Sequence, residues 1–245
     1  GEAFSALPLD HLLFTGSTQT GRRVMQAAAQ NLCPVTLELG GRSPALIGHD
    51  FDIRTAAERI LYVKCLNAGQ ICTTVDHLYL PTDKVSDFIG QARQIVPQRY
   101  PSLSSPDYTS IISAAAYRRL CDALDEAQAA GADVIPLMPG KARDKTRRRL
   151  APHLVVGAPE SCSLMRHEIF GPILPLVPYD NLQLVVQRIR SGPHPLAFYP
   201  FTHNRRELNW LLEHVMSGGV SVNDALFHVG QADLPFGGVG HSGMG

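Results

Sequence analysis

The sequence predicts an α/β fold in which a mostly parallel, twisted sheet is flanked by helices. Short apolar runs typical of strands alternate with amphipathic runs of roughly 10 to 18 residues, typical of helices, from one end of the chain to the other. Glycine and small polar residues separate the runs, as expected for turns. Strands that alternate with helices favour right-handed crossovers between parallel strands.

The first third of the chain contains the following predicted elements: strands at 12–15, 35–39 and 43–47, and a helix at 22–30. Asp50 or Asp52 can cap a further helix, whose apolar residues recur at helical spacing as far as Leu66. Asn67 and Gly69 suit its termination, because both residue types tolerate the left-handed conformation that ends many helices.

The remainder predicts strands at 75–80, 134–136, 154–156, 196–201 and 218–223, and helices at 83–95, 113–130, 182–189 and 204–216. Pro200 inside one predicted strand favours an edge position or a bulge, because proline cannot donate to a ladder. Residues 141–149 carry six basic side chains and no aromatic residue, which predicts a solvated loop. The last nine residues contain five glycines, and we expect no regular element there.

Composition narrows the function classes. The 245 residues include 22 basic and 22 acidic side chains, so the chain has no net charge to attract nucleic acid or an anionic membrane surface. No apolar run approaches the roughly 18 residues needed to cross a bilayer. The first four residues, Gly1–Phe4, do not resemble a secretion signal.

The five cysteines form no CxxC pair and no spacing typical of metal ligands, so we expect no metal site. An odd number of cysteines in a chain of this length favours reduced thiols, which predicts a cytoplasmic protein.

Two segments carry residues suited to nucleophilic chemistry. Cys72 follows the loop at 67–71, and a thiol in a glycine-containing loop can be approached closely by backbone amides. Glu38 ends an apolar run just before Gly40 and Gly41. A lone cysteine is more often a buried apolar residue than a nucleophile, and a lone glutamate is more often a surface carboxylate.

Together the two segments resemble motifs of the aldehyde dehydrogenase superfamily. Glu38-Leu39-Gly40-Gly41 resembles the family's glutamate motif, and Gly69-Gln70-Ile71-Cys72 resembles its cysteine motif. The resemblance implies that Cys72 attacks an aldehyde carbonyl and forms first a thiohemiacetal and then a thioester. It implies that Glu38 is the general base for hydrolysis of that thioester.

The resemblance also implies a site for NAD or NADP. The turn at Gly16 and Ser17 lies between a predicted strand and the start of a predicted helix, an arrangement that can bind an anion. The same sequence pattern also occurs in ordinary strand-to-helix turns that bind nothing. In the family this turn packs against the cofactor pyrophosphate, and Leu39 is expected beside the cofactor as well. Glu168 and Phe170 match the family's Glu-x-Phe-Gly-Pro motif, which implies contacts with the nicotinamide ribose and ring.

Residues 166–175 and 222–224 resemble the class 3 and fatty-aldehyde branch, near the coniferyl aldehyde dehydrogenases. This implies an aromatic aldehyde such as coniferyl aldehyde, or a medium- to long-chain aliphatic aldehyde, as substrate. Phe236 lies in a segment that resembles the Pro-Phe-Gly-Gly signature bordering the family's substrate channel.

Members of this family are roughly twice as long, so we expect this chain to be part of a longer protein. The resemblance assigns residues 1–40 to the C-terminal part of a dinucleotide-binding domain. It assigns residues 41–245 to the catalytic domain and the start of its return toward the cofactor side. It implies a homodimer or homotetramer at full length, and little activity or NAD affinity for this piece alone.

The residues also allow another class of enzyme, a cofactor-independent cysteine esterase or hydrolase that uses Cys72 and Glu38. Such enzymes usually need a histidine base. His167 and His241 lie within the matched motifs, and the sequence places neither beside Cys72.

Overall fold

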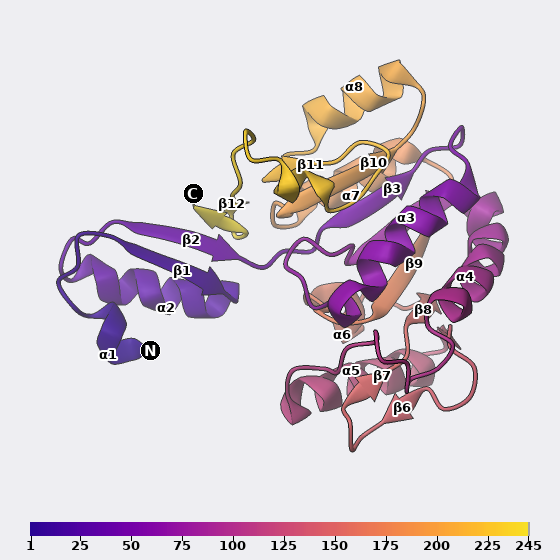
Figure 1. The fold of residues 1–245 in the computed structure, drawn as a ribbon. Coiled ribbons are helices and arrows are strands. Elements are labelled where there is room, and N and C mark those ends of the chain that lie inside the picture. The colour runs from indigo at the N-terminus through magenta and orange to yellow at the C-terminus, as the bar shows by residue number, and fades with distance from the viewer. Residues whose placement is uncertain (245) are drawn as a thin grey trace.

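A computed structural model describes residues 1–244 and has two layered units, joined where the chain passes from Leu39 to Arg42 (Figure 1). The larger unit is built on a seven-stranded sheet of order β11-β10-β3-β4-β9-β8-β5. Five of its six neighbouring pairs are parallel, and only β5 and β8 pair antiparallel. The mostly parallel α/β sheet predicted from the sequence is therefore confirmed.

The strands of this sheet are β3 (Pro44–Ile47), β4 (His77–Pro81), β5 (Asp133–Pro136), β8 (His153–Val156), β9 (Ile173–Tyr179), β10 (Ala197–Phe201) and β11 (Gly219–Val220). Its helices are α3 (Ile53–Cys65), α4 (Val85–Arg99), α5 (Ala114–Ala129), α6 (Ser163–Arg166), α7 (Leu182–Ser191) and α8 (Arg205–His214). Short 3₁₀ turns are η1 (Leu66–Gly69), η2 (Thr82–Lys84) and η3 (Phe227–Gly230).

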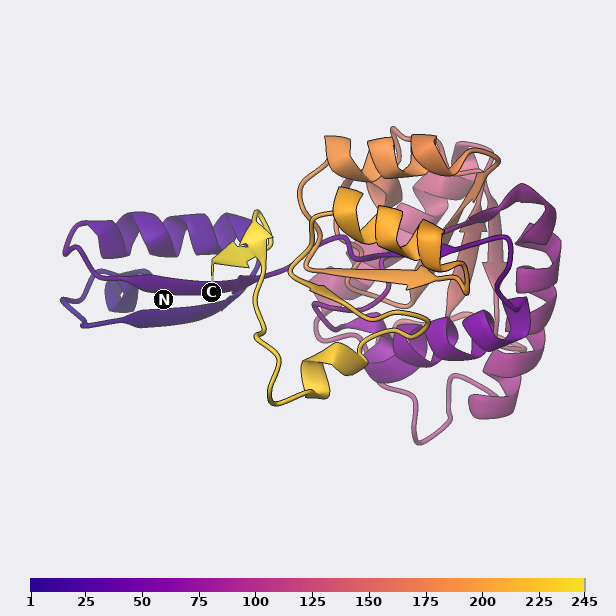
Figure 2. The ribbon, with the colours of Figure 1, turned by 90° about the horizontal axis from the view of Figure 1, so that it is seen from above.

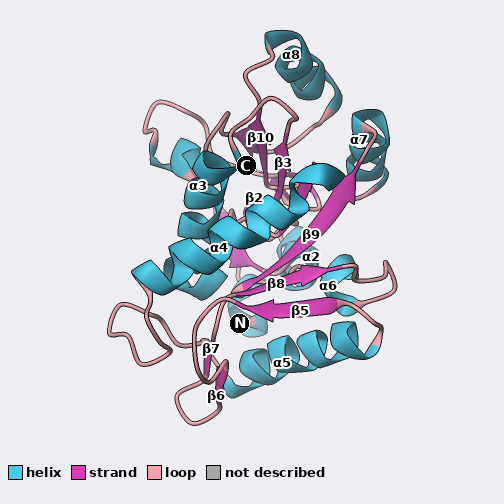
Figure 3. Ribbon diagram, turned by 90° about the vertical axis from the view of Figure 1, so that its right-hand side faces the viewer, coloured by secondary structure: helices cyan, strands magenta, loops and turns pink. Residues whose placement is uncertain are grey.

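Helices cover both faces of the seven-stranded sheet (Figures 1 and 3). Side chains of α3, α4 and α5 share one buried cluster with the sheet, and those of α7 and α8 share another. Strand β3 shows why both clusters form, because Ala45 and Ile47 enter the first while Leu46 enters the second. A strand buried on both faces needs a continuous apolar sequence, which is what β3 has.

The smaller unit contains β1 (Leu12–Gly16), β2 (Val35–Leu39), α1 (Glu2–Ser5) and α2 (Thr18–Ala29), together with β12 (Val239–Gly240) and β13 (Gly243–Met244). Strands β1 and β2 are parallel, and β13 pairs antiparallel with the other side of β2. Leu37 and Leu39 point into a separate small core with Val24 and Ala28 of α2. Figure 2 shows the end of the chain returning from the larger unit to this sheet.

Three local predictions were wrong. The glycine-rich C-terminal stretch forms the β12–β13 hairpin, because Gly243 has no side chain to collide with the Leu37 carbonyl of β2. The basic stretch 141–149 contains the short strands β6 (Arg143–Asp144) and β7 (Arg149–Leu150). Strand β10 lies inside the sheet. It tolerates Pro200 because β11 pairs only with Ala197 and Phe198.

Helix α3 begins and ends at the residues that the sequence indicated. Asp52 is the N-cap, and its side-chain oxygen accepts a hydrogen bond of 2.8 Å from the Thr55 N–H. At the other end Asn67, Ala68 and Gly69 all adopt left-handed backbone, with φ of 50°, 52° and 71°. This run turns the chain sharply away from the helix axis and begins the loop that carries Cys72.

We predict that Gly69→Ala destabilises the chain, because an added Cβ would meet the Gly171 carbonyl group in a conformation that alanine rarely adopts. The expected loss exceeds about 1 kcal/mol of unfolding free energy by denaturant titration. Gly90→Ala is the matched control, because Gly90 lies inside α4 with open space around it, and it should stabilise by about 0.5–1 kcal/mol. Equal effects of the two substitutions would contradict this account of the turn.

Candidate active site

The predicted motifs meet because β3, β4 and β9 are adjacent and parallel. In parallel strands the segments that precede each strand reach the same edge of the sheet. The segments before these three strands are 40–43, 70–76 and 167–172, which contain or adjoin the motifs around Glu38, Cys72 and Glu168. Residues far apart in sequence are therefore brought together at the amino edge of the sheet.

The loop before Cys72 is held by the buried side chain of Gln70. Its amide nitrogen donates to the carbonyls of Asn67 and Ser110 at 3.0 and 3.2 Å, and its oxygen accepts from the Ile112 N–H at 2.9 Å. On the far side of the cysteine, the Tyr199 hydroxyl donates to the Thr73 carbonyl at 2.6 Å. Cys72 thus lies between two anchored points.

Cys72 is partly buried, whereas the other four cysteines are buried. Burial raises the pKa of the Cys72 thiol, and the negative charges of Glu168 and, more weakly, Glu38 raise it further. Hydrogen bonding from the Thr73 backbone acts in the opposite direction without reversing the shift. The thiol is therefore protonated at neutral pH in this arrangement, and it needs a proton acceptor to become a nucleophile.

Glu38 is the next-to-last residue of β2, and it lies between Thr15 of β1 and Gly243 of β13. Its neighbours Leu37 and Leu39 point into the small core, so the Glu38 side chain points to the opposite face of the strand. Burial raises the pKa of the Glu38 carboxyl group. Its buried Oε2 has no hydrogen-bond partner among the described residues.

Glu168 lies against the Gly40–Gly41 turn. The Gly41 N–H donates to its Oε1 at 3.2 Å, and a Cβ on Gly40 would come within 2.7 Å of the same oxygen. Glycine at position 40 therefore makes room for this carboxylate. Burial and the nearby charge of Asp76 raise the pKa of Glu168 to about 7.

Phe170 has a φ of 45°, a left-handed conformation that is uncommon for an aromatic residue. The guanidinium of Arg119 supports this bend by donating to the Ile169 carbonyl at 2.7 Å. The segment that carries Glu168 and Phe170 is therefore held in a specific shape before it enters β9.

The predicted Gly16–Ser17 turn joins β1 to α2. Ser17 is the N-cap of that helix and accepts a hydrogen bond from the Thr20 N–H at 3.3 Å. A Cβ on Gly16 would collide with the Phe14 ring, which explains the need for glycine there. Leu39 packs against Gly21 of α2, so its side chain lies in the small core.

Phe236 lies in the irregular segment between η3 and β12, and the residue is 45% exposed. The next residue, Gly237, packs with its carbonyl against Gly218 at the start of β11. The structure therefore places Phe236 on the path of the chain as it returns to the smaller unit.

Sequence reasoning missed a buried group beside the motifs. Asp76, four residues after Cys72, is 1% exposed and binds the Arg42 guanidinium at 3.0 Å. The sequence did contain a signal for this group. A carboxylate inside the apolar run 75–80 indicates a buried charge with a partner, because an unpaired charge is rarely buried.

Residues 1–244 contain no helix that is long and apolar enough to cross a membrane. The same part of the chain holds no group of three or more His, Cys, Asp or Glu side chains arranged as metal ligands.

Residues 4–245 match the profile described as the aldehyde dehydrogenase family. The chain belongs to this family. It is 46% identical over its whole length to a probable coniferyl aldehyde dehydrogenase of Pseudomonas aeruginosa, of which it covers 51%. It is 37% identical to aldehyde dehydrogenase family 3 member A2 of Rattus norvegicus, where the match covers 96% of this chain and 48% of the relative. The chain thus spans about half the length of these relatives.

Solved structures give the same result. The substrate-bound state of Staphylococcus aureus AldH superposes with a TM-score of 0.94 and 35% identity, covering all of this chain and 52% of that one. A Mycobacterium tuberculosis aldehyde dehydrogenase complexed with NAD+ has a TM-score of 0.87 and 26% identity, with 51% of it covered. An NADP-dependent glyceraldehyde-3-phosphate dehydrogenase of Bacillus halodurans, complexed with NADP, has a TM-score of 0.89 and 26% identity, with 50% covered. The resemblance seen in the sequence motifs is confirmed at the level of the family.

The pKa of Glu168 predicts a pH dependence of stability. Between its ordinary pKa of 4.5 and about 7, the folded chain holds a proton that the unfolded chain has released. This contribution to stability is therefore complete below pH 4.5 and is lost as the pH rises through 7. Glu168→Gln removes it, so the stability advantage of the unsubstituted chain over the variant should shrink by up to about 3 kcal/mol between pH 4.5 and 8. Urea titrations of both proteins measure this, and a pH-independent difference would contradict it.

Alkylation tests the proximity of the carboxylates to Cys72 in this chain. We predict that iodoacetamide modifies Cys72 first, and that Cys72→Ser removes the fast phase seen by mass spectrometry. Glu168→Gln should speed this phase by about threefold to tenfold at pH 8, because losing a negative charge lowers the thiol pKa. Glu160→Gln is the control, since Glu160 pairs with Arg188 and is 78% exposed. An unchanged rate in the Glu168 variant would show that the two groups do not interact.

Proposed function

We propose that the full-length protein containing this chain oxidises an aldehyde to a carboxylic acid with NAD or NADP, with Cys72 as nucleophile and Glu38 as general base. The observation that carries the proposal is that one half-buried thiol lies within electrostatic reach of two carboxylates with raised pKa values. Membership of the aldehyde dehydrogenase family supports the same assignment.

In this proposal the Cys72 thiol must first lose its proton. Glu38 is suited to accept it, because its pKa is raised and one of its oxygens has no hydrogen-bond partner among residues 1–244. The sulfur then bonds to the aldehyde carbon, and the carbonyl oxygen becomes an oxyanion that the Cys72 backbone N–H can stabilise.

The bound cofactor would supply the acceptor for the hydride that leaves the same carbon. The product on the enzyme is a thioester of Cys72. Glu38 first releases the proton it took from the thiol to solvent, and its carboxylate then takes a proton from a water molecule, whose oxygen attacks the thioester carbon. The carbon–sulfur bond breaks, the acid leaves, and the Cys72 sulfur takes up a proton to restore the thiol.

Two of the segments proposed to hold the cofactor carry groups suited to that role. The turn at Gly16 and Ser17 opens the 12-residue helix α2, whose first amides favour a phosphate. Glu168 uses Oε1 to bind the Gly41 N–H, and carboxylate oxygens suit the hydroxyls of a ribose. We assign Leu39 and Phe170 to the same site, and Phe236 to the border of the substrate channel.

The relatives support either cofactor, because one solved relative is complexed with NAD+ and another with NADP. We propose an aromatic aldehyde such as coniferyl aldehyde, or a medium- to long-chain aliphatic one, since the relatives include coniferyl aldehyde dehydrogenases and a family 3 member. We also propose a homodimer or homotetramer in the cytoplasm. Five unpaired cysteines are consistent with a reducing compartment.

The two units of the fold support a division into domains. Residues 1–40 hold β1, α2 and β2 and correspond to the last part of the dinucleotide-binding domain in our proposal. Residues 41–245 form the catalytic domain and return to the smaller unit, where β13 pairs with β2.

For the full-length protein we predict that Cys72→Ala abolishes aldehyde-dependent reduction of NAD or NADP. Glu38→Gln should lower steady-state turnover by about 10²- to 10⁴-fold, the range expected for loss of a general base. Stopped-flow absorbance at 340 nm measures both. Cys121→Ala, which changes a buried thiol on α5, should behave as the unsubstituted protein.

This experiment also separates the proposal from its rival. A cofactor-independent cysteine esterase would hydrolyse an activated ester through Cys72 yet reduce neither cofactor with any aldehyde. That result in the full-length protein would overturn the dehydrogenase assignment.

A further inference from the structure

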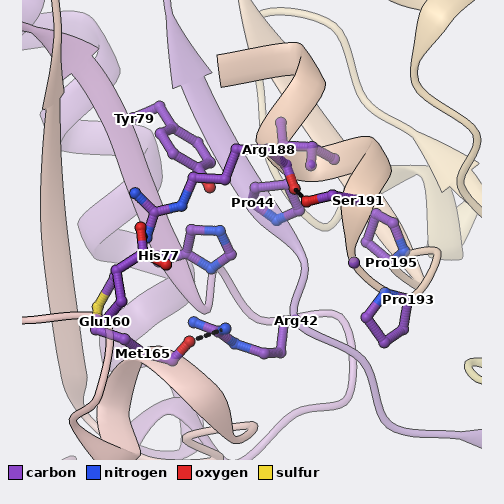
Figure 4. Close-up of a pocket in the computed structure, with 12 residues that line it drawn as sticks. Arg42, Pro44, His77, Tyr79, Glu160, Met165, Arg188, Ser191, Pro193 and Pro195 are labelled. Atoms are coloured by element: carbon purple, nitrogen blue, oxygen red, sulfur yellow. Dashed lines mark hydrogen bonds and ion pairs between the residues drawn. The ribbon is translucent and has the colours of Figure 1, made fainter. Parts of the chain in front are cut away.

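An arginine beside the site connects two of the three motif segments. Arg42 lies four residues after Glu38, and its guanidinium donates to the backbone carbonyls of Met165 and Leu164, the latter at 3.3 Å. The same guanidinium donates through Nε to the Asp76 carboxylate at 3.0 Å. Figure 4 shows Arg42 reaching across to Met165 beside His77.

Asp76 connects these two segments to the third one, residues 167–172. Its Oδ2 binds Arg42 and lies 3.2 Å from Nδ1 of His77, while its Oδ1 accepts the Ile169 N–H at 2.9 Å. The carboxylate is therefore hydrogen-bonded on both oxygens although it is 1% exposed. Burial alone would raise the pKa of Asp76, but the His77 hydrogen bond and the Arg42 charge outweigh burial and lower it.

The acceptor of the Ile169 N–H matters because Ile169 stands between Glu168 and Phe170. A backbone amide held at this point fixes the direction of both flanking residues. Arg119 holds the carbonyl of the same residue, so Ile169 is fixed at its amide and at its carbonyl. The position of Glu168 beside Gly41 therefore depends on Asp76, through the hydrogen bond that Asp76 accepts from the neighbouring Ile169 amide.

The Arg42 side of this cluster borders a pocket of about 200 Å³, lined also by His77, Tyr79 and Arg188 (Figure 4). Cys72 does not line that pocket. Arg42 and His77, the two partners of Asp76 that line this pocket, are therefore not shared with a pocket wall that contains Cys72.

We propose that Asp76 is a positioning residue, which holds the segment 168–170 against the Glu38 strand and the Cys72 loop so that Glu168 is set for the cofactor. This inference rests on the proposed function, since it assigns Asp76 to the cofactor side of the same site. Asp76 acts through the Ile169 amide and the Arg42 guanidinium, and its charge also acts directly on Glu168, but it takes no part in bond making.

The test uses Asp76→Asn in the full-length protein, because asparagine keeps the shape of the side chain. The asparagine amide lacks the negative charge that binds Arg42. Its single oxygen can accept a hydrogen bond from the side of Arg42 or from that of the Ile169 N–H, but not from both. We expect affinity for NADH, or for NADPH if that is the cofactor, to fall by about tenfold in a fluorescence titration. Alkylation of Cys72 by iodoacetamide without cofactor should change by less than about threefold.

Asp50→Asn is the matched control. Asp50 also accepts a side-chain and a backbone hydrogen bond, from Thr202 and His203 at 2.9 and 2.8 Å, but it lies after the carboxyl end of β3. Its substitution should leave the cofactor affinity unchanged. A Glu168→Gln background gives a second check, because the effect of Asp76→Asn should there shrink to less than about twofold.

The proposal is supported if Asp76→Asn lowers cofactor affinity by a factor at least three times larger than the factor by which it changes the rate of Cys72 alkylation. A smaller ratio of the two factors overturns it. If Asp76→Asn does not fold, Arg42→Lys and Arg42→Met decide the question. Lysine keeps a positive charge beside Asp76, so the Arg42→Lys protein should bind cofactor more tightly than the Arg42→Met protein. Equal affinities of the two proteins would overturn the proposal. Absence of cofactor binding or aldehyde oxidation in the unsubstituted protein would instead refute the proposed function.

Discussion

The parallel pairing of β3, β4 and β9 is the constraint on which the site depends. Because these strands run side by side in one direction, the loops that enter them lie along one edge of the sheet. Glu168 reaches Cys72 by this arrangement although 95 residues lie between them in the chain. Ligands of open parallel sheets more often lie at the carboxyl ends of strands, so this chain places Cys72 at the less usual edge.

Burial at this edge affects the chemistry in two opposing ways. It raises the pKa of Glu38 and of Glu168 and so makes both carboxylates better proton acceptors near neutral pH. It also raises the pKa of the Cys72 thiol, and the two carboxylates add to that effect. The same environment that makes the carboxylates better proton acceptors therefore keeps the Cys72 thiol protonated at neutral pH.

The fold class and most elements could be predicted from the sequence because the strands are continuous apolar runs and the helices carry clear caps, such as Asp52 on α3. The motifs could be recognised because they are local. The role of Asp76 could not be predicted, since its partners Arg42 and Ile169 lie 34 and 93 residues away. The β12–β13 hairpin was missed because its glycines pair with a strand from the other end of the chain.

Strand β2 belongs to two environments at once. Leu37 and Leu39 face helix α2, whereas Glu38, the residue between them, faces the other side of the strand. The alternation that buries the leucines thus also fixes the orientation of the acid group. Because this small core is separate from the core of the seven-stranded sheet, loosening the packing under α2 would disorient Glu38 while the larger sheet stays folded. Under the function proposed above, heat would then inactivate the full-length protein before it denatures the larger unit.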